Sequence, residues 1–438
     1  MNAVTNSASS AFAWLNAPRV LVEWQNHVSP AQWRISVAHQ LCPLSPAQRQ
    51  QDQLQSEHNL AAVRQHWPQA RLEGHDIFLH ETHHHHSNTH SPALKEPLHK
   101  ALFQQAESVH LIWIGPGQVG QEGLRQWLQA DLALRLQHGL ALEVQQVINS
   151  RGSQWLRHGE GPKLDSQWQL QRPLTGKYAQ QAVVIIDTTA APEVAAQHGT
   201  WLAQGAGVVT ANKHALSGSL AQFRQWFYHP CYAASTTVGA GLPFISTLAD
   251  PQTRPVNSFE AILSGSINAL LHQMEQGDDF HQALKNSQEL GLLEPDPSAD
   301  LDGWDSARKL LILGRILGLS LELNDIQRQP LMADFTHPEA IKALGQRITQ
   351  ARSQGECVRY VARLKQQRLQ LALENVSQHH PLAIKGCHNL LKLSHPQEQQ
   401  TLLSGPGAGP VVTAAGVLRD IRKVATTLCK QQQQSRAA

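Results

Sequence analysis

Two lysines in this chain stand beside groups that suit the reduction of a carbonyl. Lys213 follows the segment VVTAN at the expected carboxyl end of a parallel strand, and Thr188 and Thr189 end the preceding strand on the same rim. Lys309 lies four residues after Asp305, on the same face of a predicted helix. A cation polarises a carbonyl oxygen, and a proton donor serves the alkoxide that forms. The alternatives are a solvent-facing lysine at a strand end and a surface ion pair on a solvated helix.

The densest polar segment covers residues 289–313 and reads ELGLLEPDPSADLDGWDSARKLLIL. Its prolines keep Glu294 to Pro297 extended, because proline disfavours helix in the residue before it. We expect a helix to begin near Asp302, with Asp300 or Asp302 as its cap. Glu294 and Asp300 would flank this helix start, where carboxylates beside a lysine suit a substrate with an ammonium and a hydroxyl group. A capped, solvated helix is the alternative.

A glycine-rich loop, GPGQVG, follows the apolar run VHLIWI and precedes a helical pattern. This is the context of a dinucleotide fingerprint. The first glycine permits a tight turn, the second admits the pyrophosphate, and the third lets the helix pack on the strand. The expected cofactor contacts in this loop are Gly115, Gly117, Gln118, Val119 and Gly120. A turn that binds no ligand is the alternative.

The strand after this loop ends in Asn149, Ser150 and Arg151. A carboxylate at this point binds the ribose 2′-hydroxyl of NAD, whereas an arginine accommodates the 2′-phosphate of NADP. Because no carboxylate stands at the strand end, we expect NADP(H) to be preferred, with Arg151 as a contact and NAD(H) as the alternative cofactor. An ordinary surface charge is the other interpretation of Arg151.

Apolar runs alternate with helical patterns from residue 109 onward, which predicts an α/β fold with a Rossmann-type, doubly wound parallel sheet. After residue 232, glycine-rich loops and amphipathic helices predict a second, α+β domain. Its strands are expected over 259–265 and, as antiparallel neighbours, within 357–395. The predicted strands of the first sheet are 109–114, 142–149, 182–189 and 207–213.

The first 95 residues are rich in Gln and His and form a divergent extension, with a strand expected over 19–24 and a helix over 29–41. The histidine run at 80–90 is interpreted as an adventitious metal chelator, because no spaced Cys or acidic ligand accompanies it. The predicted segments are the extension (1–95), the NAD(P)-binding domain (96–232), the second domain (233–400), a glycine loop and helix (401–430) and a frayed polar tail (431–438).

Composition excludes several classes of protein. The 36 Lys plus Arg against 34 Asp plus Glu give a net charge of +2, too balanced for a nucleic-acid or anionic-membrane surface. No apolar run reaches the about 18 residues that a membrane-spanning helix needs. The five cysteines form no CxxC pair, which favours reduced thiols over a disulfide framework. A signal peptide begins with basic residues, and no basic residue precedes Arg19. We expect a soluble, cytoplasmic globular protein.

Six segments, taken in order, resemble homoserine dehydrogenases. They are GPGQVG, VVTANKHAL, TTVGAGLPFI, ILSGSINALL, the polar segment at 289–313 and GPGAGPVVTAAGV, within residues 97–425. The resemblance implies reversible reduction of L-aspartate 4-semialdehyde to L-homoserine with NADPH or NADH, on the route to threonine, methionine and isoleucine. It also implies a homodimer formed through the second, substrate-binding domain.

The resemblance assigns roles to particular residues. Lys213 and Lys309 correspond to the two lysines at the reacting oxygen, and Lys309 is the one expected to support or protonate it. Gly405, in the closing GPGAG segment, belongs to a loop that returns to the cofactor domain. The further cofactor contacts expected outside the first glycine loop are Gly405, Lys213, Thr188 and Thr189. The implied substrate-binding residues are Glu294, Asp300, Asp305 and Gly265.

The chain departs from the family at its monovalent-cation site. The main-chain carbonyls of Val238, Ala240 and Leu242 match family ligands of Na⁺ or K⁺, but the acidic position just upstream is Ser235. Loss of that carboxylate weakens the site. The chain has no room for an ACT domain after its last helix and no KFGG motif in its first 95 residues, so neither threonine feedback by that route nor aspartokinase activity is expected.

A regulatory or catalytically weak subunit is the alternative from another functional class, with the first 95 residues as its interaction surface. Ser235 and the atypical extension favour this alternative. Retention of the whole polar segment at 289–313 favours the enzyme.

Overall fold

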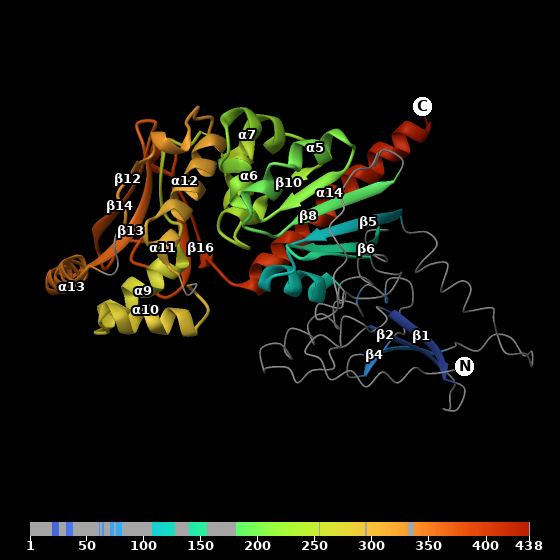
Figure 1. Ribbon diagram of the computed structural model, residues 1–438, viewed down its shortest axis with the longest axis horizontal. Helices are drawn as coiled ribbons and strands as arrows, with labels where there is room; N and C mark the ends of the chain where they lie inside the picture. The colour runs from blue at the N-terminus through green and yellow to red at the C-terminus, as the bar shows by residue number, and fades with distance from the viewer. Residues whose placement is uncertain are drawn as a thin grey trace, which may run out of the picture. The chain divides into compact units, whose positions relative to one another are not determined.

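A computed structural model describes most of the chain from residue 107 onward (Figure 1). Before residue 107 it describes helical residues 61 and 64 and four strands. No helix of the described residues is long and apolar enough to cross a bilayer. From residue 107 the described ranges are 107–127, 140–155, 181–253, 255–293, 296–331 and 337–437.

The chain divides into two compact units. The first comprises residues 1–186, 201–208 and 421–438, and the second comprises 187–200 and 209–420. The domain boundaries expected from the sequence stay predictions.

A six-stranded sheet follows the Rossmann-type pattern expected from the sequence. In sheet order its strands are β10 (Tyr232–Ala233), β9 (Gly207–Thr210), β8 (Ala182–Asp187), β5 (Glu107–Ile114), β6 (Leu140–Asn149) and β7 (Gly152–Trp155). β5 and β6 pair in parallel, and all residues of β8 and β9 are buried, as in a sheet covered on both faces. β7, which the sequence did not predict, forms an antiparallel hairpin with β6. The α/β fold class is therefore confirmed.

Short helices follow these strands, starting with a helix over residues 118–127 after β5. Asn212 and Ser219 cap α6 and α7 with their side-chain oxygens, which explains where these two helices begin. The next helices are α4 (Pro192–Ala195), α5 (His198–Ala203), α6 (Lys213–Ser217), α7 (Leu220–Phe227) and α8 (Phe244–Ala249). Short 3₁₀ helices are η4 (Ser235–Thr237), η5 (Pro251–Thr253), η6 (Leu323–Asp325) and η7 (Pro396–Glu398).

A second six-stranded sheet belongs to the second unit and confirms the predicted α+β part. In sheet order its strands are β12 (Gln327–Arg328), β14 (Arg368–Ser377), β13 (Glu356–Lys365), β11 (Ser258–Ile262), β15 (His388–Ser394) and β16 (Gln400–Pro406). Its helices are α9 (Gly265–Gln276), α10 (Phe280–Glu289), α11 (Ser298–Leu301), α12 (Trp304–Ile316) and α13 (Pro338–Ser353). α9, α12 and α13 contact the sheet, and the reader can locate them beside its strands in Figure 1.

The helix predicted to begin near Asp302 is α12, which begins two residues later at Trp304, but the expected caps Asp300 and Asp302 were wrong. Asp300 lies inside α11, and α12 begins after Gly303, whose φ of +82° favours glycine. The Asp302 carboxylate caps no helix and instead pairs with Arg328 at 2.7 Å. The Tyr360 hydroxyl, which donates to the Gln329 main-chain oxygen, occupies the place that a side chain at Gly303 would need.

Both ends of the chain also differ from expectation. A four-stranded sheet in the order β1-β2-β4-β3 lies in the extension. Its β2 replaces the predicted helix, consistent with the alternating side chains of QWRISV. At the other end α14 (Pro410–Ala437) continues through the expected frayed tail, because Gln, Lys and Arg are good helix formers. The remaining strands of the extension are β1 (Val20–Gln25), β2 (Gln32–Val37), β3 (Arg71–Glu73) and β4 (Asp76–His80).

Candidate active site

Asp305 joins the two lysines that the sequence singled out. Its Oδ1 lies 3.0 Å from Lys213 Nζ, and its Oδ2 lies 2.7 Å from Lys309 Nζ. Lys309 Nζ also donates a 2.9 Å hydrogen bond to the main-chain oxygen of Leu263, the residue after β11. Lys213 and Asp305 keep 35% and 23% of their side-chain surface exposed, so a ligand can reach the cluster.

Charge pairing fixes protonation states in this cluster. The Asp305 carboxylate raises the pKa of Lys213 above its ordinary value, while burial opposes that rise. Burial disfavours ionisation of Asp305, but the two ammonium groups outweigh burial and hold the pKa of Asp305 well below its ordinary value. At neutral pH the carboxylate is therefore ionised and Lys213 is protonated.

Two helix starts place these charges. Lys213 is the first residue of α6, where the helix dipole disfavours a cation, and Asp305 is in the first turn of α12, where the dipole favours an anion. Their pairing offsets the unfavourable position of Lys213. Lys309 lies one turn further along α12, on the face predicted from the four-residue spacing.

The acidic residues expected around the substrate are described in part. Asp300, in α11, lies near enough to Lys213 to add to the rise of its pKa. Glu294 lies outside the described residues. The structure thus brings Asp300 and Asp305 to Lys213, while the substrate-binding roles of the acidic residues stay predictions.

Two glycines named in the sequence analysis have packing reasons of their own. Gly265 begins α9 rather than ending a strand, because Ser264 caps that helix. A Cβ at Gly265 would stand 2.8 Å from Cys387 Sγ, and one at Gly405, in β16, would stand 2.9 Å from Leu242 Cδ2. Close packing explains both glycines without a ligand, so their binding roles stay predictions.

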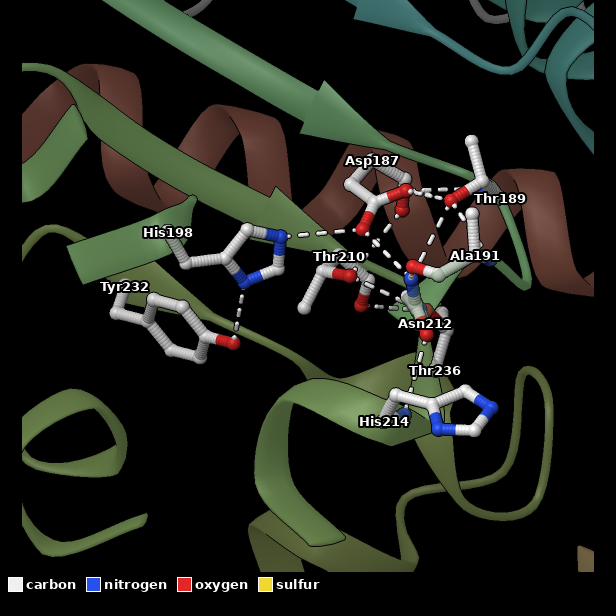
Figure 2. Close-up of polar contacts among 9 residues, drawn as sticks. All are labelled: Asp187, Thr189, Ala191, His198, Thr210, Asn212, His214, Tyr232 and Thr236. Atoms are coloured by element: carbon white, nitrogen blue, oxygen red, sulfur yellow. Dashed lines mark hydrogen bonds and ion pairs between the residues drawn. The ribbon is translucent and has the colours of Figure 1, made fainter. Parts of the chain in front are cut away.

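A buried polar cluster around Asp187 was missed by the sequence analysis (Figure 2). Asp187 ends β8, and its Oδ1 accepts hydrogen bonds from Thr189 N (2.9 Å) and Thr189 Oγ1 (2.7 Å). Its Oδ2 faces His198 Nε2 at 3.1 Å and accepts from Asn212 Nδ2 at 3.0 Å. The available signal was a lone carboxylate at the end of the apolar run AVVIID.

The glycine loop lies in the first unit. Gly115 follows β5 with a φ of +85°, as the predicted tight turn requires, and its N–H donates to the Ile148 oxygen. A Cβ on Gly117 would meet no atom of the described residues within 4 Å, so these residues leave space beside the loop. The predicted contacts Gln118, Val119 and Gly120 form the start of the helix over 118–127.

Gly123 of this helix, which the sequence analysis did not single out, packs closely against the preceding strand. A Cβ there would stand 2.5 Å from the Trp113 ring of β5. Glycine at this position therefore lets the helix lie close to the strand.

The strand-end residues expected to contact the cofactor occupy turns. Arg151 lies exposed between β6 and β7, and its N–H donates to Asn149 Oδ1 at 2.8 Å. Thr188 and Thr189 follow β8, where Thr189 is held by Asp187. Their cofactor contacts stay predictions.

The segment expected to bind a cation, residues 235–242, begins with the neutral Ser235, which lies beside the carboxylate of Asp420. Ser235 Oγ is buried without a hydrogen-bond partner among the described residues. Its main-chain N–H donates to Asp420 Oδ2, a buried carboxylate of α14, at 2.8 Å. No donor to the carbonyls of Val238, Ala240 and Leu242 is found in the described part of the chain.

Family models match both parts of the chain. The model for homoserine dehydrogenase matches residues 243–421, and the model for the homoserine dehydrogenase NAD binding domain matches residues 115–229. The chloroplastic bifunctional aspartokinase/homoserine dehydrogenase 2 of Zea mays is 31% identical over 370 residues. That alignment covers 75% of this chain and 40% of the relative, so the chain spans less than half the length of this relative.

Solved structures share the fold. A homoserine dehydrogenase from Thiobacillus denitrificans has a TM-score of 0.60 and 21% identity, with 75% of this chain and 76% of that chain covered. A hyperthermophilic archaeal homoserine dehydrogenase in complex with NADPH has a TM-score of 0.58 and 21% identity, with 72% and 97% covered.

The two family matches follow one another in the chain and contain its two clustered lysines. Lys213 lies within the NAD-binding match and Lys309 within the second match. Residues 115–229 and 243–421 are therefore domains of the homoserine dehydrogenase family.

Proposed function

We propose that this chain reversibly reduces L-aspartate 4-semialdehyde to L-homoserine with a nicotinamide cofactor, as an oxidoreductase acting on a CH–OH group. The Asp305 bridge carries this proposal, because it holds two ammonium groups together at a partly exposed site. Membership of these two domains in the homoserine dehydrogenase family supports the substrate class and a place in the aspartate pathway.

The lysines act on the substrate oxygen. The nicotinamide, when bound, supplies the hydride to the aldehyde carbon. An ammonium group has three N–H donors. Lys309 directs one to Asp305 and one to the Leu263 oxygen, which leaves a third for the substrate oxygen. That donor stabilises the developing negative charge and provides the proton, while the protonated Lys213 adds a second positive charge.

Carboxylates hold the other end of the substrate. Both oxygens of Asp305 face lysines, so its main task is to order those ammonium groups. Asp300, beside Lys213, and Glu294, earlier in the same segment, are proposed to bind the substrate ammonium group. A homodimer and a cytoplasmic location stay predictions from the resemblance and the composition.

The proposed cofactor is NADP(H) in preference to NAD(H). The space beside Gly117 suits a pyrophosphate, and the helix that starts at Gln118 attracts an anion. The exposed Arg151 side chain follows the strand end at which dinucleotide domains distinguish a 2′-phosphate from a hydroxyl.

A monovalent cation, Na⁺ or K⁺, is proposed at residues 235–242. Carbonyl and hydroxyl oxygens are suitable ligands for such a hard ion, and Ser235 Oγ has no other described partner. The Asp420 carboxylate, bonded to the Ser235 N–H, places negative charge beside the segment. The ion would tie the Val238, Ala240 and Leu242 carbonyls together.

The substitution Asp305→Asn tests the proposed function. The amide keeps the shape but loses the charge and turns a donor toward an ammonium group, so kcat should fall at least about a hundredfold. The measurement is NADPH oxidation, followed by absorbance, with L-aspartate 4-semialdehyde as substrate. Glu289→Gln, which breaks the exposed Lys285–Glu289 pair on α10, is the matched control and should keep wild-type kcat. Turnover within tenfold of wild type in a folded Asp305→Asn variant would reject the role of the bridge, and an inactive wild type would reject the proposed function.

Arg151→Glu tests the cofactor preference. A carboxylate at this turn repels a 2′-phosphate and accepts a 2′-hydroxyl, so the ratio of kcat/KM for NADPH over NADH should fall at least about tenfold. Arg368→Glu changes an arginine that is also exposed in a hairpin, and it should leave the ratio unchanged. An unchanged ratio of kcat/KM for NADPH over NADH in Arg151→Glu would show that this arginine does not bind the 2′-phosphate.

Ser235→Glu tests the cation site. Adding a carboxylate should lower the concentration of Na⁺ or K⁺ needed for half-maximal activity at least about tenfold, because the ligand set gains a charge. Ser235→Ala, which removes the hydroxyl without adding charge, should raise that concentration. Activity is measured with choline chloride holding ionic strength constant. Equal wild-type and Ser235→Glu activity in choline and in potassium would contradict a cation at this segment.

A further inference from the structure

The Asp187 carboxylate is buried at the end of β8 with all of its near neighbours acting as hydrogen-bond donors. It is fully inaccessible to solvent, and four donors from three other residues surround its two oxygens. A carboxylate oxygen can accept more than one hydrogen bond, so these donors hold both oxygens of Asp187 in place.

The histidine beside Asp187 lies between that carboxylate and a tyrosine hydroxyl. His198 Nδ1 lies 3.1 Å from the hydroxyl of Tyr232, and burial followed by the Asp187 charge raises the pKa of Tyr232 well above its ordinary value. The tyrosine therefore keeps its proton and can donate it to Nδ1, so that Nε2–H donates to Asp187. Tyr232, His198 and Asp187 form a chain of bonds that fixes the plane of the carboxylate (Figure 2).

The Asp187 oxygen that faces His198, Oδ2, also connects the cluster to the segment that carries Lys213. Asn212 Nδ2 donates to Asp187 Oδ2 and to the Ala191 oxygen, which holds the loop after β9 against the loop after β8. Asn212 Oδ1 accepts the His214 N–H and caps α6. Lys213 lies between Asn212 and His214 in the sequence, so hydrogen bonds fix the main chain on both sides of it.

We propose that Asp187 is a positioning residue for Lys213, acting through Asn212, and that the Tyr232–His198 pair orients its carboxylate. The inference rests on the proposed function only for its effect on turnover. Asp187 touches neither Lys213 nor Asp305 in any described contact, and it sets the backbone position from which the Lys213 side chain reaches Asp305.

A cluster that only stabilises the fold and a cluster that positions Lys213 respond differently to the loss of a hydrogen bond. Loss of a structural bond lowers stability and leaves the folded site unchanged. Loss of a positioning bond moves the Lys213 ammonium away from Asp305, and that changes both turnover and the chemical reactivity of this one amine. The two cases are separated by readouts that are specific to Lys213.

The test variant is Asn212→Ser. Serine keeps a good cap for α6 but has no amide to donate to Asp187 and Ala191. We expect kcat to fall about tenfold to a hundredfold, as a misplaced reacting group does, with the KM for the cofactor within twofold of wild type. The control Ser219→Ala removes the cap of α7, which has no bond to Asp187, and should leave kcat unchanged.

A second readout does not depend on turnover. Competitive labelling with acetic anhydride, read by mass spectrometry, reports how much of each lysine is the neutral amine. Pairing with Asp305 keeps Lys213 protonated, so its labelling should rise at least about threefold in Asn212→Ser. Lys309, which keeps Asp305 and the Leu263 oxygen, is the internal reference and should change little.

Two substitutions of the buried His198 test its hydrogen bond to Asp187. His198→Gln keeps a side-chain donor for Asp187, whereas His198→Phe removes it. We expect Lys213 labelling to rise in the phenylalanine variant and to stay near the wild-type value in the glutamine variant. Unchanged Lys213 labelling in folded Asn212→Ser and His198→Phe would overturn the proposal. An inactive wild type with the expected labelling would reject only the proposed function.

Discussion

The site depends on one carboxylate that keeps two ammonium groups together. Like charges repel, and partly buried charges lose hydration, so Lys213 and Lys309 can share a site only with a counter-ion between them. Asp305 supplies it through one oxygen to each lysine, at 3.0 and 2.7 Å. The same pairing keeps Asp305 ionised and Lys213 protonated, which is the charge state that carbonyl reduction requires.

The surrounding fold meets this constraint by bringing distant segments to one point. α12 supplies Asp305 and Lys309 from a single face, and its start after Gly303 fixes where Asp305 lies. The first residue of α6 supplies Lys213, and the Leu263 oxygen after β11 accepts a hydrogen bond from Lys309. The Asp187 cluster bonds to Asn212, the residue that precedes Lys213, and so supports the main chain that carries one member of the charge pair.

Local patterns in the sequence predicted the parts of the site that depend on local geometry. The four-residue spacing placed Asp305 and Lys309 on one face, and the end of an apolar run placed Lys213 at a strand end. Long-range contacts could not be predicted in this way. The Asp187–His198 bond and the Asp420 bond to Ser235 join residues whose proximity depends on tertiary packing. The expected cap of the helix that begins near Asp302 was wrong, because the Asp302 carboxylate pairs with Arg328 from another element.

The most direct measurement of the central claim is a double-mutant cycle on Lys213→Ala and Lys309→Ala, with kcat/KM for the aldehyde determined for wild type, both single variants and the double variant. If Asp305 makes the lysines one unit, the double variant should lose about as much as the worse single variant, since groups that act together are strongly non-additive. Losses that multiply would show that the two lysines act independently and would contradict the account.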